Sequence, residues 1–293
     1  MKKGLKLVAL VSALFLGNTF VQAQTGLKRA NKQYDNLAYY YAINTYEQVA
    51  NNGFVSSDIL KKLGNSYYFN GEYASANKWY GILFTDYNFE DLESEYYYRY
   101  AETLKNIGDN QNADLYFKKF AEKNQNSTRA LIISSKVDSQ EEIVRNSGRY
   151  ILSSLEINSP YSDYSASFHD EKLLFTSARD TGNFFKRIFS WTGGSFTKIY
   201  QSEIDSVGNL AKPKRFNGKV NSIFNESSPV ITKDGKTMYF TRNNYLNGER
   251  GYDLNNITLL KIYRAEFIDN KWTNVTELPF NDHNFNTAHP TLN

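Results

Sequence analysis

The chain has 293 residues, with 34 Lys and Arg against 31 Asp and Glu, and no cysteine. The near balance of charge argues against the strongly basic face that nucleic-acid-binding domains present. Without cysteine there are no disulfides, no thiol nucleophile and no lipid-modified N-terminal thiol, so core packing alone must hold the fold. The length suits two domains.

The first 23 residues have the pattern of a signal peptide. Three lysines and no acidic residue lie in this stretch, and an apolar run covers residues 7–16. Val21 and Ala23 then occupy the small-residue positions that precede a cleavage site, which predicts cleavage between Ala23 and Gln24. The run is shorter than the roughly 20 apolar residues of a membrane span, which argues against a permanent anchor. Cleavage would leave 31 basic and 31 acidic residues and a neutral mature chain.

Residues 24–126 contain a repeat of about 34 residues that predicts pairs of helices. Small residues at two offsets in each repeat would let neighbouring helices approach closely, and an aromatic residue would fill the space between repeats. Gly71 and Gly108 would end the first helix of a pair. The small residues are Ala30, Ala42, Gly64, Ala76, Ala101 and Ala113, and the aromatic residues are Tyr46, Tyr80 and Phe117.

This spacing resembles the tetratricopeptide repeat, whose pattern includes L-G-x-x-Y and A-x-x-x-F. Leu60 and Tyr97 stand where that family has an early Trp, and its closing Pro is absent, so the number of repeats stays open by one. A generic array of helical hairpins predicts nearly the same shape.

The resemblance implies a partner-binding groove on the first helices, and a merely solvated helix face is the alternative. By repeat offset, the predicted groove residues are Asp58, Lys61, Asn65, Tyr68, Glu95, Tyr98, Glu102 and Lys105.

Residues 127–154 are polar and are interpreted as a connector, and from residue 155 onward short alternating runs predict β-strands. A second repeat, of about 63 residues, matches 196–204 with 259–267. Each unit should contain four short antiparallel strands, with Asp234-Gly235 at a hairpin turn. Residues 286–291 repeat the start of the second unit, so we expect a third unit to begin there.

The run at 228–241 resembles the Tol-type, WD-like β-propeller repeat, in which four antiparallel strands make one blade. The resemblance implies two complete blades and a truncated third over residues 155–293. The predicted fold class is therefore α + β and multidomain: a helical repeat array followed by an incomplete antiparallel β-propeller, in a chain that is a fragment of a longer protein.

Catalytic and metal-binding patterns are weak in this sequence. None of the three histidines has metal-ligand spacing, and neither a nucleophile elbow nor a phosphate-binding loop is present. We therefore expect no enzymatic activity, cofactor or metal. Arg179 is expected to pair with an acidic residue of a neighbouring unit.

The order of the modules resembles the N-terminal part of OmpA-family envelope proteins of Gram-negative bacteria. That resemblance implies an exported scaffold in the periplasm, associated with the outer membrane, with envelope proteins as partners. It also implies peptidoglycan binding through a further C-terminal domain and, in some members, a role in type IX secretion or gliding. The alternative is the gating region of a propeller-containing serine peptidase, although such peptidases generally lack an upstream helical array.

Overall fold

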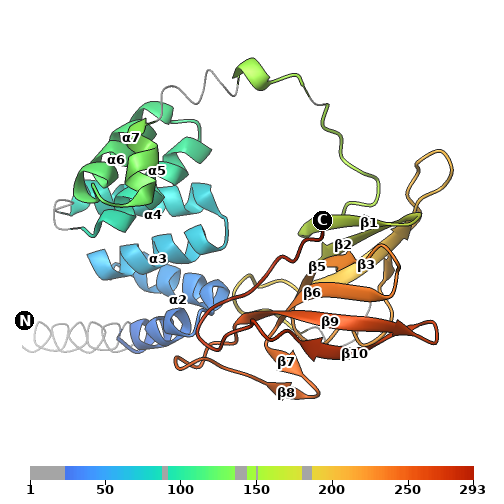
Figure 1. Cartoon of the computed structure of the whole chain (residues 1–293). Coiled ribbons are helices and arrows are strands. Elements are labelled where there is room, and N and C mark those ends of the chain that lie inside the picture. The colour runs from blue at the N-terminus through green and yellow to red at the C-terminus, as the bar shows by residue number, and fades with distance from the viewer. Residues whose placement is uncertain (1–23, 88–91, 136–143, 150, 180–186) are drawn as a thin grey trace, which may run out of the picture. The chain divides into compact units, whose positions relative to one another are not determined.

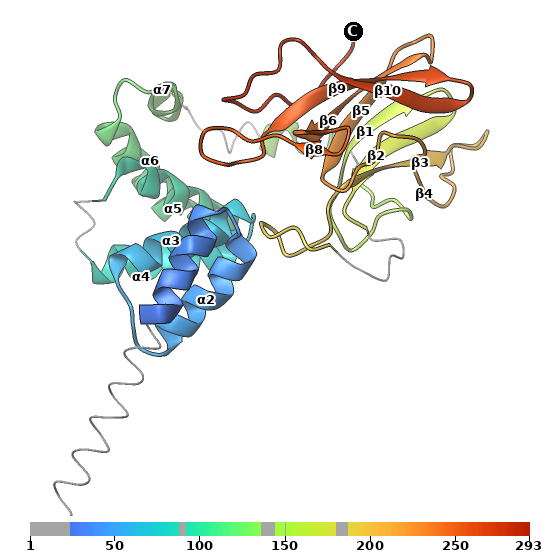
Figure 2. The same cartoon turned by 90° about the horizontal axis from the view of Figure 1, so that it is seen from below.

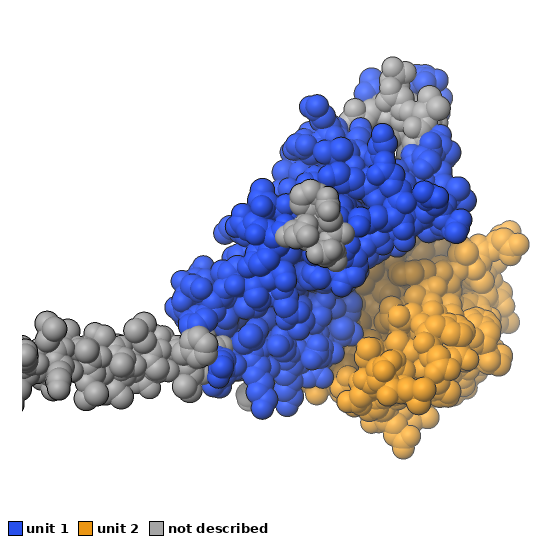
Figure 3. Space-filling model, turned by 90° about the vertical axis from the view of Figure 1, so that its left-hand side faces the viewer, with its two compact units in different colours: residues 1–150, 190–193 blue, residues 151–189, 194–293 orange. Residues whose placement is uncertain are grey.

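The structure is a computed structural model that describes residues 24–87, 92–135, 144–149, 151–179 and 187–293. The predicted signal peptide, with Ala23, lies outside the described residues. The chain divides into two compact units (Figure 3): unit 1 holds residues 1–150 and 190–193, and unit 2 holds residues 151–189 and 194–293. Among the described residues, no helix has the length and apolar character that a membrane crossing requires.

Unit 1 is an array of short helices in which each helix packs against the next in the chain (Figures 1 and 2). Residues 24–35 form the first helix. The others are α2 (Tyr39–Asn51), α3 (Ser57–Phe69), α4 (Tyr73–Asp86), α5 (Ser94–Asn106), α6 (Asn110–Lys123) and α7 (Thr128–Ser135). The helical repeat array is thus confirmed. Helix α7 lies in the stretch interpreted as a connector, and its Ala130 is buried.

The small residues of the repeat lie at the helix contacts, as their spacing predicts. All six are buried. The contact at Gly64 leaves no room for a side chain, because a Cβ added there would lie 2.5 Å from Cε1 of Tyr80. Gly71 and Gly108 adopt φ values of 74° and 87°, the left-handed conformation that ends a helix.

The aromatic position of the repeat is buried in the first two repeats but not in the third. Tyr46 and Tyr80 are completely buried, whereas Phe117 is half-buried and Phe120 is buried instead. The prediction for Phe117 was wrong, because the last helix pair is followed by the eight-residue α7 rather than by a full pair.

Unit 2 contains two four-stranded antiparallel sheets and a small ribbon. Sheet 1 has the order β1 (Asp163–His169), β2 (Lys172–Ser177), β3 (Lys198–Glu203), β4 (Lys214–Arg215). Sheet 2 has the order β10 (Lys271–Glu277), β9 (Leu260–Ile268), β6 (Thr237–Asn243), β5 (Glu226–Ile231). The ribbon pairs β7 (Tyr245–Leu246) with β8 (Glu249–Arg250). Four antiparallel strands per sequence unit are as expected.

Tight turns set the register of sheet 2. Gly235 has a φ of 70° in the turn between β5 and β6, which confirms the predicted Asp-Gly hairpin. Asp269 and Asn270 have φ values of 49° and 58° between β9 and β10. Positive φ at both central residues is the type I′ geometry that matches strand twist.

The two sheets share one apolar core, to which sheet 1 contributes Leu174 and Ile199 and sheet 2 contributes Met238, Phe240 and Tyr263. They therefore pack together as a repeated pair. Within the described part of the chain these sheets do not close into a ring. The structure thus confirms a helical array with antiparallel sheets, while the propeller stays a prediction.

Two lead-in segments, residues 225–228 and 286–289, make matching hydrogen bonds. The first precedes and begins β5: Thr197 N–H donates to Asn225 Oδ1 at 2.9 Å, and the Ser228 N–H donates to Thr176 Oγ1 at 3.2 Å. The second segment repeats both bonds on sheet 2. Leu260 N–H donates to Asn286 Oδ1 at 2.7 Å, and His289 N–H donates to Thr241 Oγ1 at 2.8 Å. The sequence match at residues 286–291 is thus also a structural one.

Candidate protein-binding face

Tyrosines and cationic side chains alternate on one set of helices in unit 1. We call this set the tyrosine face. It comprises Tyr34, Tyr68, Tyr96 and Tyr98, with Lys61, Arg99 and Arg129 beside the rings of the last three. All four rings are half-buried, so each offers part of its surface to solvent.

Asn65 of α3 lies beneath the centre of this face and bonds to side chains from several helices. Its Oδ1 accepts hydrogen bonds from the Tyr80 hydroxyl at 2.8 Å and from Arg99 Nη1 at 2.7 Å. Its Nδ2 donates to the Tyr34 hydroxyl at 2.9 Å. Asn65 is only 4% exposed. It therefore positions its neighbours, and does not lie in the open groove that repeat offset predicted for it.

The same arrangement occurs one repeat earlier, which indicates that it belongs to the repeat. Asn31 Oδ1 accepts from the Tyr46 hydroxyl at 2.6 Å and from Lys62 Nζ at 2.9 Å. Asn31 and Asn65 lie 34 residues apart. That recurrence of Asn was a sequence signal for a structural amide.

Arg99 of α5 is the residue that the sequence analysis missed. Its guanidinium lies 4.8 Å from the ring centroid of Phe69, 5.7 Å from that of Tyr68 and 5.9 Å from that of Tyr96. It also forms an ion pair with Glu95 at 3.5 Å. Aromatic rings and a carboxylate on several sides hold the planar guanidinium in a fixed orientation.

Ion pairs between helices hold the ends of the face. Lys61 Nζ donates to Glu93 Oε2 at 2.9 Å, and this hydrogen bond lowers the pKa of Glu93 below its ordinary value. Arg129 of α7 pairs with Glu95 at 2.7 Å and lies 4.6 Å from the ring centroid of Tyr98. These groups are partly exposed, so each pair contributes modestly to stability.

The phenols of Tyr68 and Tyr98 are neutral at physiological pH. The Tyr68 hydroxyl donates to Glu102 Oε2. Burial raises the pKa of Tyr68 above its ordinary value, and the Glu102 carboxylate raises it further. Burial also raises the pKa of Tyr98.

Two predicted groove residues lie at the edges of the face. Asp58 is exposed and forms an ion pair with Lys62 at 3.1 Å. Lys105 is exposed, near the end of α5, and no ion pair of Lys105 occurs among the described residues. Of the eight predicted residues, six thus take part in the contacts that build the face: Lys61, Asn65, Tyr68, Glu95, Tyr98 and Glu102.

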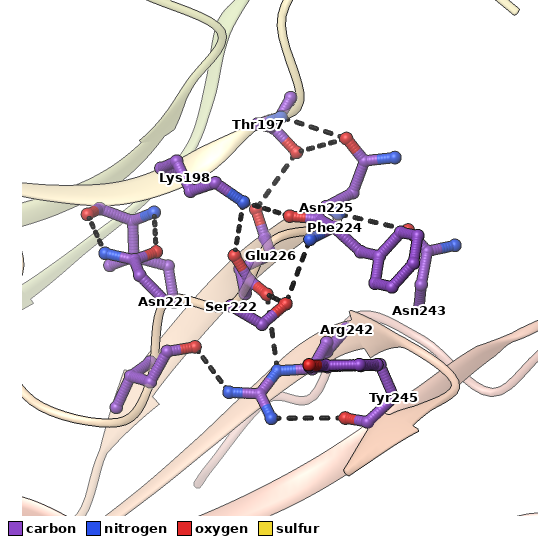
Figure 4. A network of polar contacts seen from close by, with 12 residues as sticks. Thr197, Lys198, Asn221, Ser222, Phe224, Asn225, Glu226, Arg242, Asn243 and Tyr245 are labelled. Carbon is purple, nitrogen blue, oxygen red and sulfur yellow. Dashed lines mark hydrogen bonds and ion pairs between the residues drawn. The ribbon is translucent and has the colours of Figure 1, made fainter. Parts of the chain in front are cut away.

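Unit 2 contains a buried charge network (Figure 4) centred on Glu226. Lys198 Nζ donates to Glu226 Oε2 at 2.8 Å, and Arg242 Nε lies 3.3 Å from Oε1. Ser222 donates a short hydrogen bond to the same carboxylate. Burial lowers the pKa of Lys198 and of Arg242, against the opposing attraction of Glu226. Both cationic side chains are paired with Glu226, so we interpret the network as structural.

Arg179 is the counterpart of Arg242 in sheet 1, and its partner differs from the prediction. It pairs with Asp163 of its own sheet at 3.0 Å rather than with an acidic residue of a neighbouring unit. Its guanidinium also lies 5.1 Å from the ring centroid of Phe175. The sheet brings the start of β1 beside the residues that follow β2, and this favours a partner within the sheet.

Over the described residues, no group of three His, Cys, Asp or Glu side chains is placed to hold a metal ion. Ser228 Oγ lies 2.7 Å from His289 Nδ1, but it also lies 3.1 Å from Ser165 Oγ. All three residues occupy the same repeat position and have φ near 50–59°. The contact therefore belongs to the sheet repeat.

Comparisons with known proteins add little to this description. No family model matches the chain, and no curated protein matches it. One solved structure with similarity is the C-terminal part of a TPR repeat-containing protein from Cytophaga hutchinsonii, at 19% identity and a TM-score of 0.31. The match covers 33% of this chain and 38% of that one. The description of unit 1 as a helical repeat array rests on its own helices.

Proposed function

We propose that the chain is a non-enzymatic scaffold of the cell envelope and that it binds a protein partner through the tyrosine face. The composition of that face carries the proposal. Tyrosine and arginine are enriched at protein–protein interfaces, where they supply most of the binding free energy. Here four partly exposed tyrosines and two arginines lie on alternate helices of the array, namely the first helix, α3, α5 and α7.

The fixed side-chain conformations of the tyrosine face support the same function. Asn65 and the surrounding rings hold Arg99 in place before any partner arrives. A binding surface whose side chains are already ordered loses less conformational entropy on association. Repeat arrays present such surfaces over several neighbouring units.

The finer proposal is that the stacked sheets of unit 2 are the first two blades of a β-propeller. The second lead-in segment supports this, because it lies on sheet 2 with the hydrogen bonds that the first makes on sheet 1. By resemblance, we further propose export after cleavage between Ala23 and Gln24, and a periplasmic location at the outer membrane. Peptidoglycan contact through a further domain and a role in type IX secretion or gliding belong to the same proposal.

Site-specific photocrosslinking tests the binding function. A photoreactive amino acid placed at Asp58 or Lys105, at the edges of the face, should give a discrete covalent adduct with another protein in living cells. The matched control positions are Lys118 and Glu122 on α6, which are exposed and should give none. Equal labelling at all four positions, or none at any, would contradict a partner on this face.

A further inference from the structure

Lys198 and Lys261 occupy the same position of the sheet repeat, 63 residues apart, but their surroundings differ. Lys198 is paired with the buried Glu226, as described above. Lys261 is completely buried, and its Nζ has no hydrogen-bond partner within the part of the chain that the structure describes. A buried ammonium without a counter-ion is strongly unfavourable.

The second lead-in segment has a threonine, and no acidic residue, at the position that Glu226 occupies in the first. The Glu226 N–H donates to Thr197 O at 3.0 Å, and the Thr287 N–H donates to Leu260 O at 2.9 Å. Thr287 therefore stands where Glu226 stands in the first segment. Its Oγ1 is also buried without a partner among the described residues.

The nearby acidic residue of the second segment is engaged elsewhere. Asp282 takes the place of Ser222: its Oδ1 accepts from the Asn284 N–H at 2.7 Å, as Ser222 Oγ accepts from the Phe224 N–H at 3.0 Å. Over the described residues Asp282 forms no ion pair. Lys261 Nζ and Thr287 Oγ1 are thus both buried without a partner among the described residues, and they occupy the places that Lys198 and Glu226 occupy in the first repeat unit.

We propose that Lys261 and Thr287 bind a small monovalent anion, of the size of formate or chloride, in place of the carboxylate that Glu226 supplies to Lys198. The ammonium provides the charge, and the threonine hydroxyl donates a hydrogen bond. The lead-in segment covers the anion, so binding stabilises the start of β9 and the segment together.

Amide hydrogen exchange of the full chain tests this proposal, with an internal control. Sodium gluconate, whose anion is too large for a covered site, is replaced by sodium formate or chloride at constant ionic strength. Exchange in β9 (260–268) should slow about tenfold when the anion is at ten times its dissociation constant. Exchange in β3 (198–203) should not change, because Glu226 already fills the equivalent place.

Variants separate this site from a general salt effect. Lys261→Met should abolish the anion dependence, and Thr287→Glu should give full protection of β9 without any added anion. Anion-independent exchange in the wild-type chain would overturn the proposal, as would the same anion effect in Lys261→Met. Loss of β9 protection in Asp282→Asn would identify Asp282 as the counter-ion and would also overturn it.

Discussion

Gly64 offers the sharpest test of how the helical array packs. Substitution by Ala places a Cβ 2.5 Å from Cε1 and 2.6 Å from Cδ1 of the Tyr80 ring. Tyr80 is completely buried and its hydroxyl is bonded to Asn65, so the ring cannot swing into solvent. Either α3 and α4 must move apart or the Tyr80 hydrogen bond must break.

The expected change in the free energy of unfolding of Gly64→Ala is the sum of two opposing effects. Overpacking a well-packed core costs about 1–3 kcal/mol. Replacing Gly by Ala within a helix returns about 1 kcal/mol of helix propensity. We therefore expect Gly64→Ala to lower the free energy of unfolding by up to about 2 kcal/mol.

Gly81→Ala is the matched control, because Gly81 also lies within a helix, α4. Its added Cβ would meet only the Tyr100 hydroxyl, at an ordinary 3.6 Å. This variant should be stabilised by up to about 1 kcal/mol. Urea unfolding followed by far-UV circular dichroism at the helical minimum measures both. If Gly64→Ala is stabilised as much as Gly81→Ala, Tyr80 does not pack on Gly64 and the assignment of this helix contact is wrong.

Two further predictions concern unit 2. Glu226→Gln leaves Lys198 and Arg242 buried without an acidic partner, so it should destabilise unit 2 by about 3–5 kcal/mol in urea unfolding; a loss below 1 kcal/mol would mean that water reaches the network. Asp163 is partly buried, which raises its pKa, but hydrogen bonds from Ser177, Ser159 and Arg179 outweigh this and lower the pKa below its ordinary value. A lowered folded-state pKa stabilises the fold above the unfolded pKa of about 3.9, and this stability is lost as pH falls through the folded value. Asp163→Asn should therefore flatten the fall in urea midpoint below about pH 4, and an unchanged slope would contradict the shift.

Repeat spacing predicted the parts of the fold that depend on short-range pattern. The small residues such as Gly64 and Ala76, and the turn at Asp234-Gly235, follow from steric limits that any such helix pair or hairpin must meet. The tyrosine face was harder to predict from the sequence, because the contacts at its centre join successive repeats. Asn65 and Arg99 lie 34 residues apart, and offset alone does not show that one side chain reaches under the other.

The central claim is that a protein partner binds the tyrosine face. It is tested most directly by titration calorimetry, which measures the affinity of the chain for the partner captured by photocrosslinking. Tyr98→Ala removes a half-buried ring of the tyrosine face, and Leu115→Ala removes an exposed apolar side chain of α6. The account predicts that Tyr98→Ala weakens binding by at least about tenfold, in the range of an interface hot spot, while Leu115→Ala leaves it unchanged. Equal affinities for the wild type and Tyr98→Ala, or a loss confined to Leu115→Ala, would contradict it.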